Sequence, residues 1–386
     1  MAKASFGRRA LLALLVSASS LSLARAADPI RIGSVVSATG PTAFLGDPEA
    51  RTLKIYVEEL NKKGGLLGRP VELVLYDDGG DANKARTFAT RLVEDDHVVA
   101  VAGGTSTGST LAMAPVFEEA KIPFVSFAGA IEIVEPVRPY VFKTPHTDKT
   151  ACQKIFSDMK ARGLQKVALI SGADGFGKSM RAQCLKVAGD YGITIVADET
   201  YASADTDMVP QLTKIRGVMG VQAVLNPGFG QGPAIVTRNY AQLGIALPLY
   251  QSHGVASKSF IDLAGPAAEG VRLPAPALLV AGKLADSDPQ KPVAAAYKAS
   301  YEAATGQPVS TFGGYGFDGI QLVTEAIRRA NSTDGEKIRD ALEATKNYVG
   351  VTGVYTMTPT DHLGLSPDSF RMLRIEKGDW VIDSAK

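Results

Sequence analysis

The sequence is poor in the residues that build metal and redox centres. Its 386 residues include only two cysteines and four histidines. Cys152 and Cys184 stand far along the chain from His253, so the three make a poor zinc set. The two cysteines fall in helix-like segments on either side of an expected strand, Lys166–Ser171. In an oxidising compartment they are candidates for a disulfide, and two small buried apolar residues are the alternative.

The chain also lacks an excess of either charge. Lysine and arginine number 41, and aspartate and glutamate number 40. The first 26 residues hold four of the basic residues and no acid, which leaves 37 basic and 40 acidic residues, a net charge of −3, in the remainder. Such a chain has no surplus of positive charge with which to attract nucleic acid or an anionic membrane.

Long apolar runs are missing after the N-terminus, where one short run is typical of a secretory signal. Basic residues at Lys3, Arg8 and Arg9 precede the apolar segment Ala10–Leu23, and Ala24-Arg25-Ala26 is an A-x-A cleavage site. We expect Met1–Ala27 to be a signal peptide that is cleaved near Ala26. Because no later run reaches membrane-spanning length, we expect an exported, soluble protein.

Strands and helices alternate from the start of the remaining chain. The pattern predicts strands at Ile30–Val36 and Val71–Asp77, and helices at Asp47–Gly64 and Ala82–Asp95. Strand–helix units of this length favour doubly wound parallel sheets, which bind ligands at the carboxyl ends of their strands. About 360 residues exceed one ordinary core, so we expect two domains.

The stretch Val98–Val125 is the centre of the first domain. It predicts a buried strand, Val98–Ala102, then a loop of small polar residues, Gly103–Ser109, and then a helix, Thr110–Ala120. The loop directs backbone N–H groups and hydroxyls to the positive end of that helix. This arrangement indicates an anion site suited to a carboxylate or a phosphate.

Two sharper motifs overlap the same loop. Gly103-x4-Gly108 has the spacing of a phosphate-binding loop but lacks the lysine that meets the phosphates. Gly104-Thr105-Ser106-Thr107-Gly108 matches the G-x-S-x-G turn of serine hydrolases, with His253 downstream as a possible base. A secreted hydrolase that uses Ser106 and His253 is therefore an alternative to a binding protein.

An ordered set of short motifs resembles one family. The motifs are Thr39-Gly40-Pro41, Gly46-Asp47, the run Asn61–Gly68, Tyr76-Asp77-Asp78 and the loop Thr105–Thr110. In order and spacing they resemble type I periplasmic solute-binding proteins of ABC importers, and most of all the leucine/isoleucine/valine-binding branch. The resemblance implies a monomeric periplasmic receptor, not an enzyme, that needs no cofactor and delivers a small molecule to an ABC permease in the inner membrane.

The resemblance also implies two doubly wound lobes that are joined by three crossing segments and close over the ligand. On this pattern residues 28–147 and 275–355 form lobe one, and residues 148–274 and 356–386 form lobe two. The crossings are expected near Thr144–Asp148, Pro274–Leu278 and Val351–Thr358. Asp318 is expected to cap a helix at Gly319–Asn331, and His146 and His362 are expected at surface or turn positions.

Site residues carry over from the family position by position. Hydroxyls and backbone N–H groups that hold the ligand's carboxylate match Ser106, Thr107, Ser109, Ala128 and Ala130, although Ala130 lacks the family's hydroxyl. The apolar walls match Leu45 (a tyrosine in the family), Phe176 and Phe229, and Phe312 and Tyr315 are expected to close the pocket.

His253 departs from the family pattern. The leucine-binding members place an acid here, which neutralises the ammonium of the ligand, whereas an imidazole supplies no fixed negative charge. We therefore expect a small carboxylate with an aromatic or apolar body rather than a free amino acid. The alternative is an amino acid whose ammonium is met by Asp174, Asp205 or Asp207.

Overall fold

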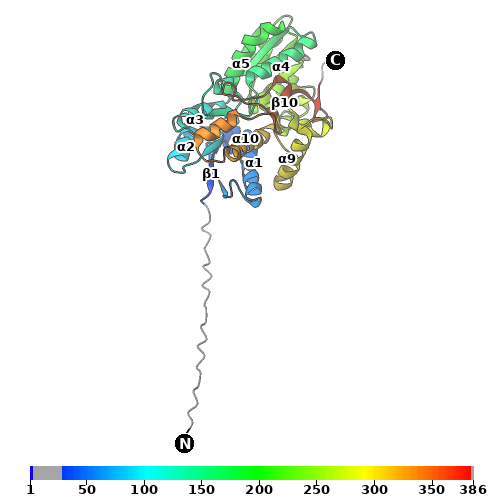
Figure 1. Cartoon of the computed structure of the whole chain (residues 1–386). Helices are drawn as coiled ribbons and strands as arrows, with labels where there is room; N and C mark the ends of the chain where they lie inside the picture. The colour runs from blue at the N-terminus through cyan, green and yellow to red at the C-terminus, as the bar shows by residue number, and fades with distance from the viewer. Residues whose placement is uncertain (3–27, 384–386) are drawn as a thin grey trace.

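Two α/β lobes make up the described part of the chain, residues 1–2 and 28–383 of the computed structural model. In Figure 1 the lobe that carries α1 (Ala43–Lys62), α2 (Ala82–Glu94) and α3 (Thr107–Glu119) lies below the lobe that carries α4 (Asp148–Ala161) and α5 (Gly175–Val187). The predicted signal peptide lies outside the described residues apart from Met1 and Ala2.

Lobe one is built on a five-stranded parallel sheet in the order β2-β1-β3-β4-β5. Its strands are β1 (Ile30–Val36), β2 (Val71–Asp77), β3 (Ala100–Gly103), β4 (Phe124–Ser126) and β5 (Val141–Lys143). The later helices of this lobe are α9 (Gln290–Thr305), α10 (Thr311–Ala330) and α11 (Gly335–Glu343). The hairpin β11–β12 (Tyr348–Val349, Val354–Tyr355) follows them.

Both faces of this sheet are covered, which explains the near-continuous apolar strands. Ile32 and Val36 of β1 pack with residues of α1 and α10, whereas Val35 points the other way into a cluster with α2 and α3. Because the side chains of a strand alternate between faces, one apolar strand fills both cores.

Lobe two contains a seven-stranded sheet in the order β14-β13-β10-β9-β8-β6-β7. The strands are β6 (Lys166–Gly172), β7 (Thr194–Tyr201), β8 (Ala223–Asn226), β9 (Leu249–Gln251), β10 (Arg272–Pro276), β13 (Phe370–Glu376) and β14 (Asp379–Ile382). β13 runs antiparallel to both of its neighbours, so this sheet is parallel except for one strand. The remaining helices are α6 (Val209–Gly217), α7 (Gln231–Gln242) and α8 (Lys258–Ala264).

Three segments cross between the lobes. The first joins β5 to α4, as the sequence predicts, and the second follows β10 through the 3-10 segment Ala277–Lys283. The third lies later than expected. Met357 belongs to the core of lobe one, and His362 stacks on Phe142 with 4.0 Å between ring centroids. Lobe one therefore extends to about residue 364, and the chain crosses just before β13 begins at Phe370.

Two sequence expectations about polar residues are wrong. Asp318 lies inside α10 and does not cap it. Its carboxylate accepts hydrogen bonds from the N–H groups of Val351 and Thr352 at 2.8 Å, so it anchors the β11–β12 hairpin. His146 and His362 are buried and do not lie at the surface, although His362 does stand in a turn, which Asp361 stabilises.

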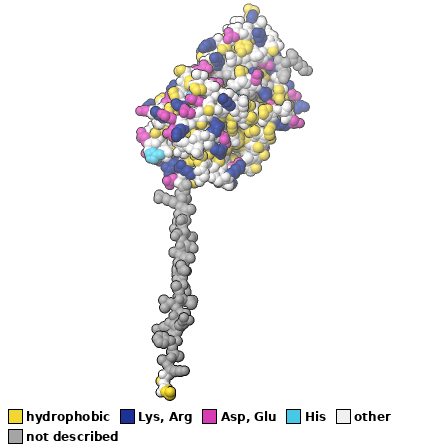
Figure 2. Space-filling view, viewed as in Figure 1, with side chains coloured by type: hydrophobic (Ala, Val, Ile, Leu, Met, Phe, Trp, Pro, Cys, Tyr) yellow, Lys and Arg dark blue, Asp and Glu magenta, His cyan; other side chains and the backbone are white. Residues whose placement is uncertain are grey.

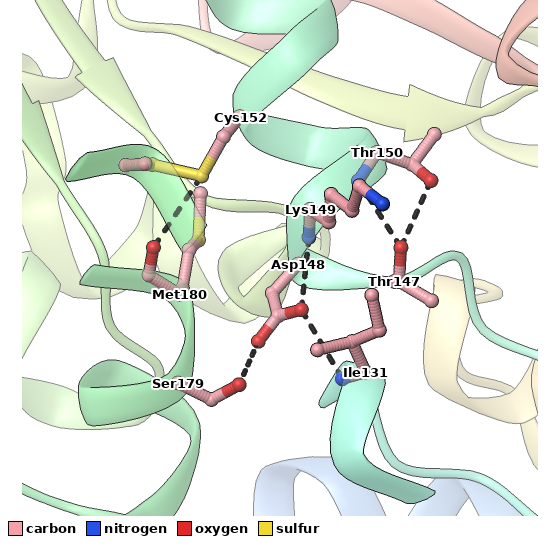
Figure 3. Close-up of a disulfide and its surroundings, with 9 residues drawn as sticks. Ile131, Thr147, Asp148, Lys149, Thr150, Cys152, Ser179 and Met180 are labelled. Atoms are coloured by element: carbon pink, nitrogen blue, oxygen red, sulfur yellow. Dashed lines mark hydrogen bonds between the residues drawn. A yellow bond between two sulfur atoms is a disulfide. The ribbon is translucent and has the colours of Figure 1, made fainter. Parts of the chain in front are cut away.

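Cys152 of α4 and Cys184 of α5 are joined by a disulfide, which Figure 3 shows beside the N-terminal part of α4. Their Cα atoms are 5.1 Å apart, within the usual range for this bond. The bond braces the two helices that cover one face of the lobe-two sheet. Among the described helices, none combines the length and the apolar character needed to cross a bilayer.

Removing the disulfide should destabilise the protein. The bond closes a loop with a sequence separation of 32, for which chain entropy predicts a loss of about 2–4 kcal/mol in the free energy of unfolding. The measurement is denaturant unfolding of the Cys152→Ala, Cys184→Ala double variant against the wild type. A reducing agent should destabilise the wild type and leave the double variant unchanged, and equal stability of the two proteins would contradict the assignment.

Candidate ligand-binding site

A cavity with about 410 Å³ of unfilled space, its opening included, lies between the lobes. Loops at the carboxyl ends of strands supply most of its wall, as expected for doubly wound sheets. The lining residues are Leu45, Thr105, Ser106, Thr107, Phe127, Ala128, Gly129, Pro145, Phe176, Phe229, His253, Gly254, Phe312 and Tyr315.

The N-terminus of α3 forms one end of the cavity. Ser106 caps this helix, and its Oγ accepts the N–H of Ser109 at 3.1 Å. The hydroxyl of Thr107, the first residue of the helix, is buried without a hydrogen-bond partner. Because the first N–H groups of a helix have no partner within it, this end of α3 offers several donors and a positive dipole to an anion.

Helix α5 approaches α3 from lobe two, and the positive dipole at its N-terminus is already neutralised. The carboxylate of Asp174 caps α5 and accepts the N–H groups of Phe176 and Gly177, each at 2.9 Å. A Cβ added to Gly175 would lie 3.7 Å from the Cβ of Thr107, so the two helix ends nearly touch. The free anion-binding capacity at this junction therefore belongs to α3.

Aromatic rings from both lobes form the walls. Phe176 and Phe229 of lobe two meet edge to face with 6.0 Å between centroids, and His253 lies 5.3 Å from Phe176. Phe44 of lobe one stacks on Phe229 at 6.4 Å and packs against Phe312 at 5.8 Å. The cavity is therefore mostly apolar, with polar atoms at a few places only, as in small-molecule sites generally.

Two further polar groups of the wall have no partner. Both ring nitrogens of His253 and the hydroxyl of Tyr315 are buried without a hydrogen bond. Burial, reinforced by the nearby positive charge of Lys143, lowers the pKa of His253 to about 3, so its imidazole is neutral at physiological pH. Burial also raises the pKa of the Tyr315 hydroxyl, which keeps it protonated. Each group can donate and accept hydrogen bonds without carrying a charge.

Among the described residues, no acidic side chain lines the cavity. Of the three aspartates that could have met an ammonium group, Asp174 caps α5, whereas Asp205 and Asp207 accept backbone N–H groups of their own exposed loop. Nor do the described residues contain a group of three or more histidine, cysteine or acidic side chains that could hold a metal ion.

Most of the residues predicted from the sequence come together in this cavity. Ser109 and Ala130 do not line it, and the N–H of Ala128 donates to the Ser126 hydroxyl at 3.1 Å. The predicted residues that line the cavity are Leu45, Ser106, Thr107, Ala128, Phe176, Phe229, His253 and Tyr315.

Sequence reasoning missed Gly129, which lets the lobes approach. A Cβ at this position would lie 2.8 Å from Cε2 of Phe176 and 3.0 Å from Nε2 of His253. The place of Gly129 in the loop after β4 was the available signal, but its partners come from the other lobe. The lobes also meet where the Thr311 hydroxyl donates to the carbonyl of Ala256 at 2.8 Å. The cleft is therefore closed.

The hydrolase alternative fails on geometry. The Ser106 hydroxyl is engaged with Ser109, and neither ring nitrogen of His253 contacts it. A serine nucleophile needs a base within hydrogen-bond reach and an acid that orients this base, and His253 has neither contact.

Comparison with known proteins agrees with this two-lobed architecture. Residues 29–379 match a family described as periplasmic binding protein. The chain belongs to this family. An extracellular ligand-binding receptor from Rhodopseudomonas palustris HaA2 is 28% identical and superposes with a TM-score of 0.86, covering 92% of this chain and all of the other.

Two relatives of this periplasmic binding protein are named for amino acids. The leucine-, isoleucine-, valine-, threonine- and alanine-binding protein of Pseudomonas aeruginosa is 26% identical over 96% of this chain and 92% of its own length. The branched-chain amino acid transporter substrate-binding protein LivJ of Streptococcus pneumoniae, solved in complex with isoleucine, is 26% identical with a TM-score of 0.80, over 92% of this chain and 98% of its own. This chain is accordingly a solute-binding protein and not an enzyme, and its family is extracytoplasmic.

Replacing Gly129 by alanine should weaken ligand binding by about tenfold or more, because the added methyl group meets Phe176 and His253 only when the lobes close. Titration calorimetry, with a carboxylate that raises the melting temperature of the wild type, measures this loss. Gly108→Ala is the matched control, because a Cβ there meets nothing closer than 3.9 Å. Equal losses in the two variants would show that the closed contact is unimportant.

Proposed function

We propose that this protein is the periplasmic receptor of an ABC importer and captures a small organic acid that has an aromatic or apolar body and no ammonium group. The observation that carries this proposal is a closed cavity that has free donors at the N-terminus of α3 and no acidic side chain in its wall.

The cost of burying charge supports an acid over an amino acid. A carboxylate gains the α3 N–H groups and the Thr107 hydroxyl, which together resemble the anion sites of other helix N-termini. The ammonium of an amino acid would lose its hydration against Phe176, Phe229 and a neutral His253, with no carboxylate to compensate. Amino acid binding is the second candidate, and the names of the relatives favour it.

The cavity also suggests how such a ligand is oriented. We expect its carboxylate to lie on Thr107 and the start of α3, and its apolar body to lie between the rings of Phe176 and Phe229. The unpartnered groups of His253 and Tyr315 remain for a hydroxyl or carbonyl group of the ligand. We expect the monomeric closed complex to deliver this ligand to the permease.

A thermal-shift screen tests the choice of ligand. Aromatic and aliphatic carboxylates form one set, and branched-chain and polar amino acids form the other. A ligand at a hundred times its dissociation constant stabilises the folded state by about 2.7 kcal/mol, which raises the melting temperature visibly. We expect shifts with the acids alone. Shifts with leucine or valine alone would refute the acid proposal and support amino acid binding.

The His253→Glu variant should lose affinity for the acids by about tenfold or more, because it places a carboxylate beside the carboxylate ligand. His253→Gln is the matched control, since its amide keeps a donor and an acceptor without charge. We expect the glutamine variant to retain most of the affinity. If both variants bind the acids as the wild type does, His253 does not select the ligand.

A further inference from the structure

One serine hydroxyl lies between two carboxyl groups where the lobes meet. Ser179 of α5, in lobe two, has its Oγ 2.6 Å from Oε2 of Glu132, in the 3-10 turn Ile131–Ile133 of lobe one. The same Oγ contacts Oδ2 of Asp148, the first residue of α4. Figure 3 shows the Asp148 carboxyl reaching from α4 to Ser179 on one side and to the backbone of Ile131 on the other.

The two contacts of the Ser179 hydroxyl determine how many protons this cluster must hold. A serine hydroxyl carries one proton and can donate it to one acceptor only. If Glu132 and Asp148 were both ionised, one of the two contacts with Ser179 would bring two oxygen atoms together with no proton between them, which is repulsive. Both contacts are hydrogen bonds only when one of the two carboxyl groups is protonated and donates to the serine oxygen.

The surroundings of Asp148 act on its proton in both directions. Its Oδ1 accepts the N–H groups of Ile131 at 3.1 Å and of Lys149 at 2.8 Å, and its Oδ2 faces Ser179. Burial and the charge of Glu132 raise the pKa of Asp148, whereas the hydrogen bonds from Ser179 and from the N–H of Lys149 and the charge of Lys143 lower it. Burial is the largest of these effects, and the resulting pKa is about 6.

One cation acts in the opposite direction. Lys143 of β5 lies buried nearby and its charge lowers the pKa of Asp148, but its Nζ donates to the carbonyls of Gly129 and Ala130 at 2.7 and 3.1 Å. Burial lowers the pKa of Lys143 to about 7, although the charges of Asp148, Glu132 and Glu135 act to raise it.

Glu132 belongs to lobe one and Ser179 to lobe two, so this hydroxyl contact requires closed lobes. We propose that closure traps one proton between Glu132 and Asp148 through Ser179, and that ligand affinity therefore rises as the pH falls. Asp148 and Ser179 act here as positioning residues, because neither lines the cavity. The proposal rests on lobe closure and not on the identity of the ligand.

The direction of the pH dependence follows from the linkage between proton binding and lobe closure. Opening moves the charge of Glu132 away from Asp148, and this charge raises the pKa of Asp148, so Asp148 holds a proton more tightly in the closed state than in the open state. Closure is then most favoured below the ordinary carboxyl pKa of about 4. The preference falls as the pH rises toward the raised closed-state pKa, and it is absent above that value.

Disulfide trapping of the ligand-free protein tests this idea. The parent protein for the test carries Thr107→Cys and Gly175→Cys, because the Cβ atoms of these positions would lie 3.7 Å apart in the closed state, a distance that suits a disulfide. The rate of trapping then reports how often the lobes close. Rates are compared between variants at one pH, so the pH dependence of the thiol chemistry cancels in the ratio.

The Glu132→Gln change is the decisive variant. Its amide can donate to the Ser179 oxygen without an added proton, so we expect trapping roughly fivefold faster than in the parent at about pH 8 and an equal rate at about pH 5.5. Ser179→Ala removes the bridge, and we expect it to match the parent at about pH 8 and to trap more slowly at about pH 5.5.

Glu135→Gln is the matched control, because it removes an equal charge near Lys143 without a contact to Ser179. We expect its rates to equal those of the parent at both pH values. The proposal is overturned if the Glu132→Gln ratio is the same at both pH values, or if Glu135→Gln produces the same ratios as Glu132→Gln. Because no ligand is present, these outcomes are independent of whether the protein binds acids or amino acids.

Discussion

The need of buried polar groups for partners governs the cleft of this protein. Thr107, His253 and Tyr315 present polar atoms that are buried in the closed form and have no hydrogen bond. Burial without a partner costs free energy, so the empty closed form is disfavoured by these groups. A ligand that satisfies them removes this cost. Ligand binding and closure are therefore coupled, because the polar atoms that bind the ligand also disfavour closure when no ligand is bound.

The sequence was informative wherever the determinants are local. The strands at Ile30–Val36 and Val71–Asp77 were expected at their observed bounds, because the pattern of apolar residues in each is local. Phe176 and Phe229 were placed in the cleft by the resemblance to the family, and both line the cavity. The resemblance to a known family supplied the lobes, and it also supplied the argument about charge at His253, where the family places an acid.

Features that depend on the other lobe or on distant packing were not predictable. α10 begins at Thr311, eight residues before its expected start, because glycines in its first turns suggest a loop. One of them, Gly314, is required by packing, since a Cβ there would meet Leu278 at 2.6 Å. Asp318 looked like a helix cap because its true partners, Val351 and Thr352, are more than 30 residues away. Gly129 likewise became meaningful only when Phe176 and His253 were seen opposite it.

The bond between Cys152 and Cys184 has a consequence beyond stability. It joins α4, which begins at the first crossing, to α5, which carries the lobe-two side of the cleft. Lobe two is thereby stiffened directly beside a segment that must bend. Thiols remain reduced in the cytoplasm, so the bond forms only where the surroundings are oxidising. Whether this bond is formed therefore depends on the compartment that the protein has reached. Lobe two gains its full stiffness only in oxidising surroundings, such as those outside the cytoplasm.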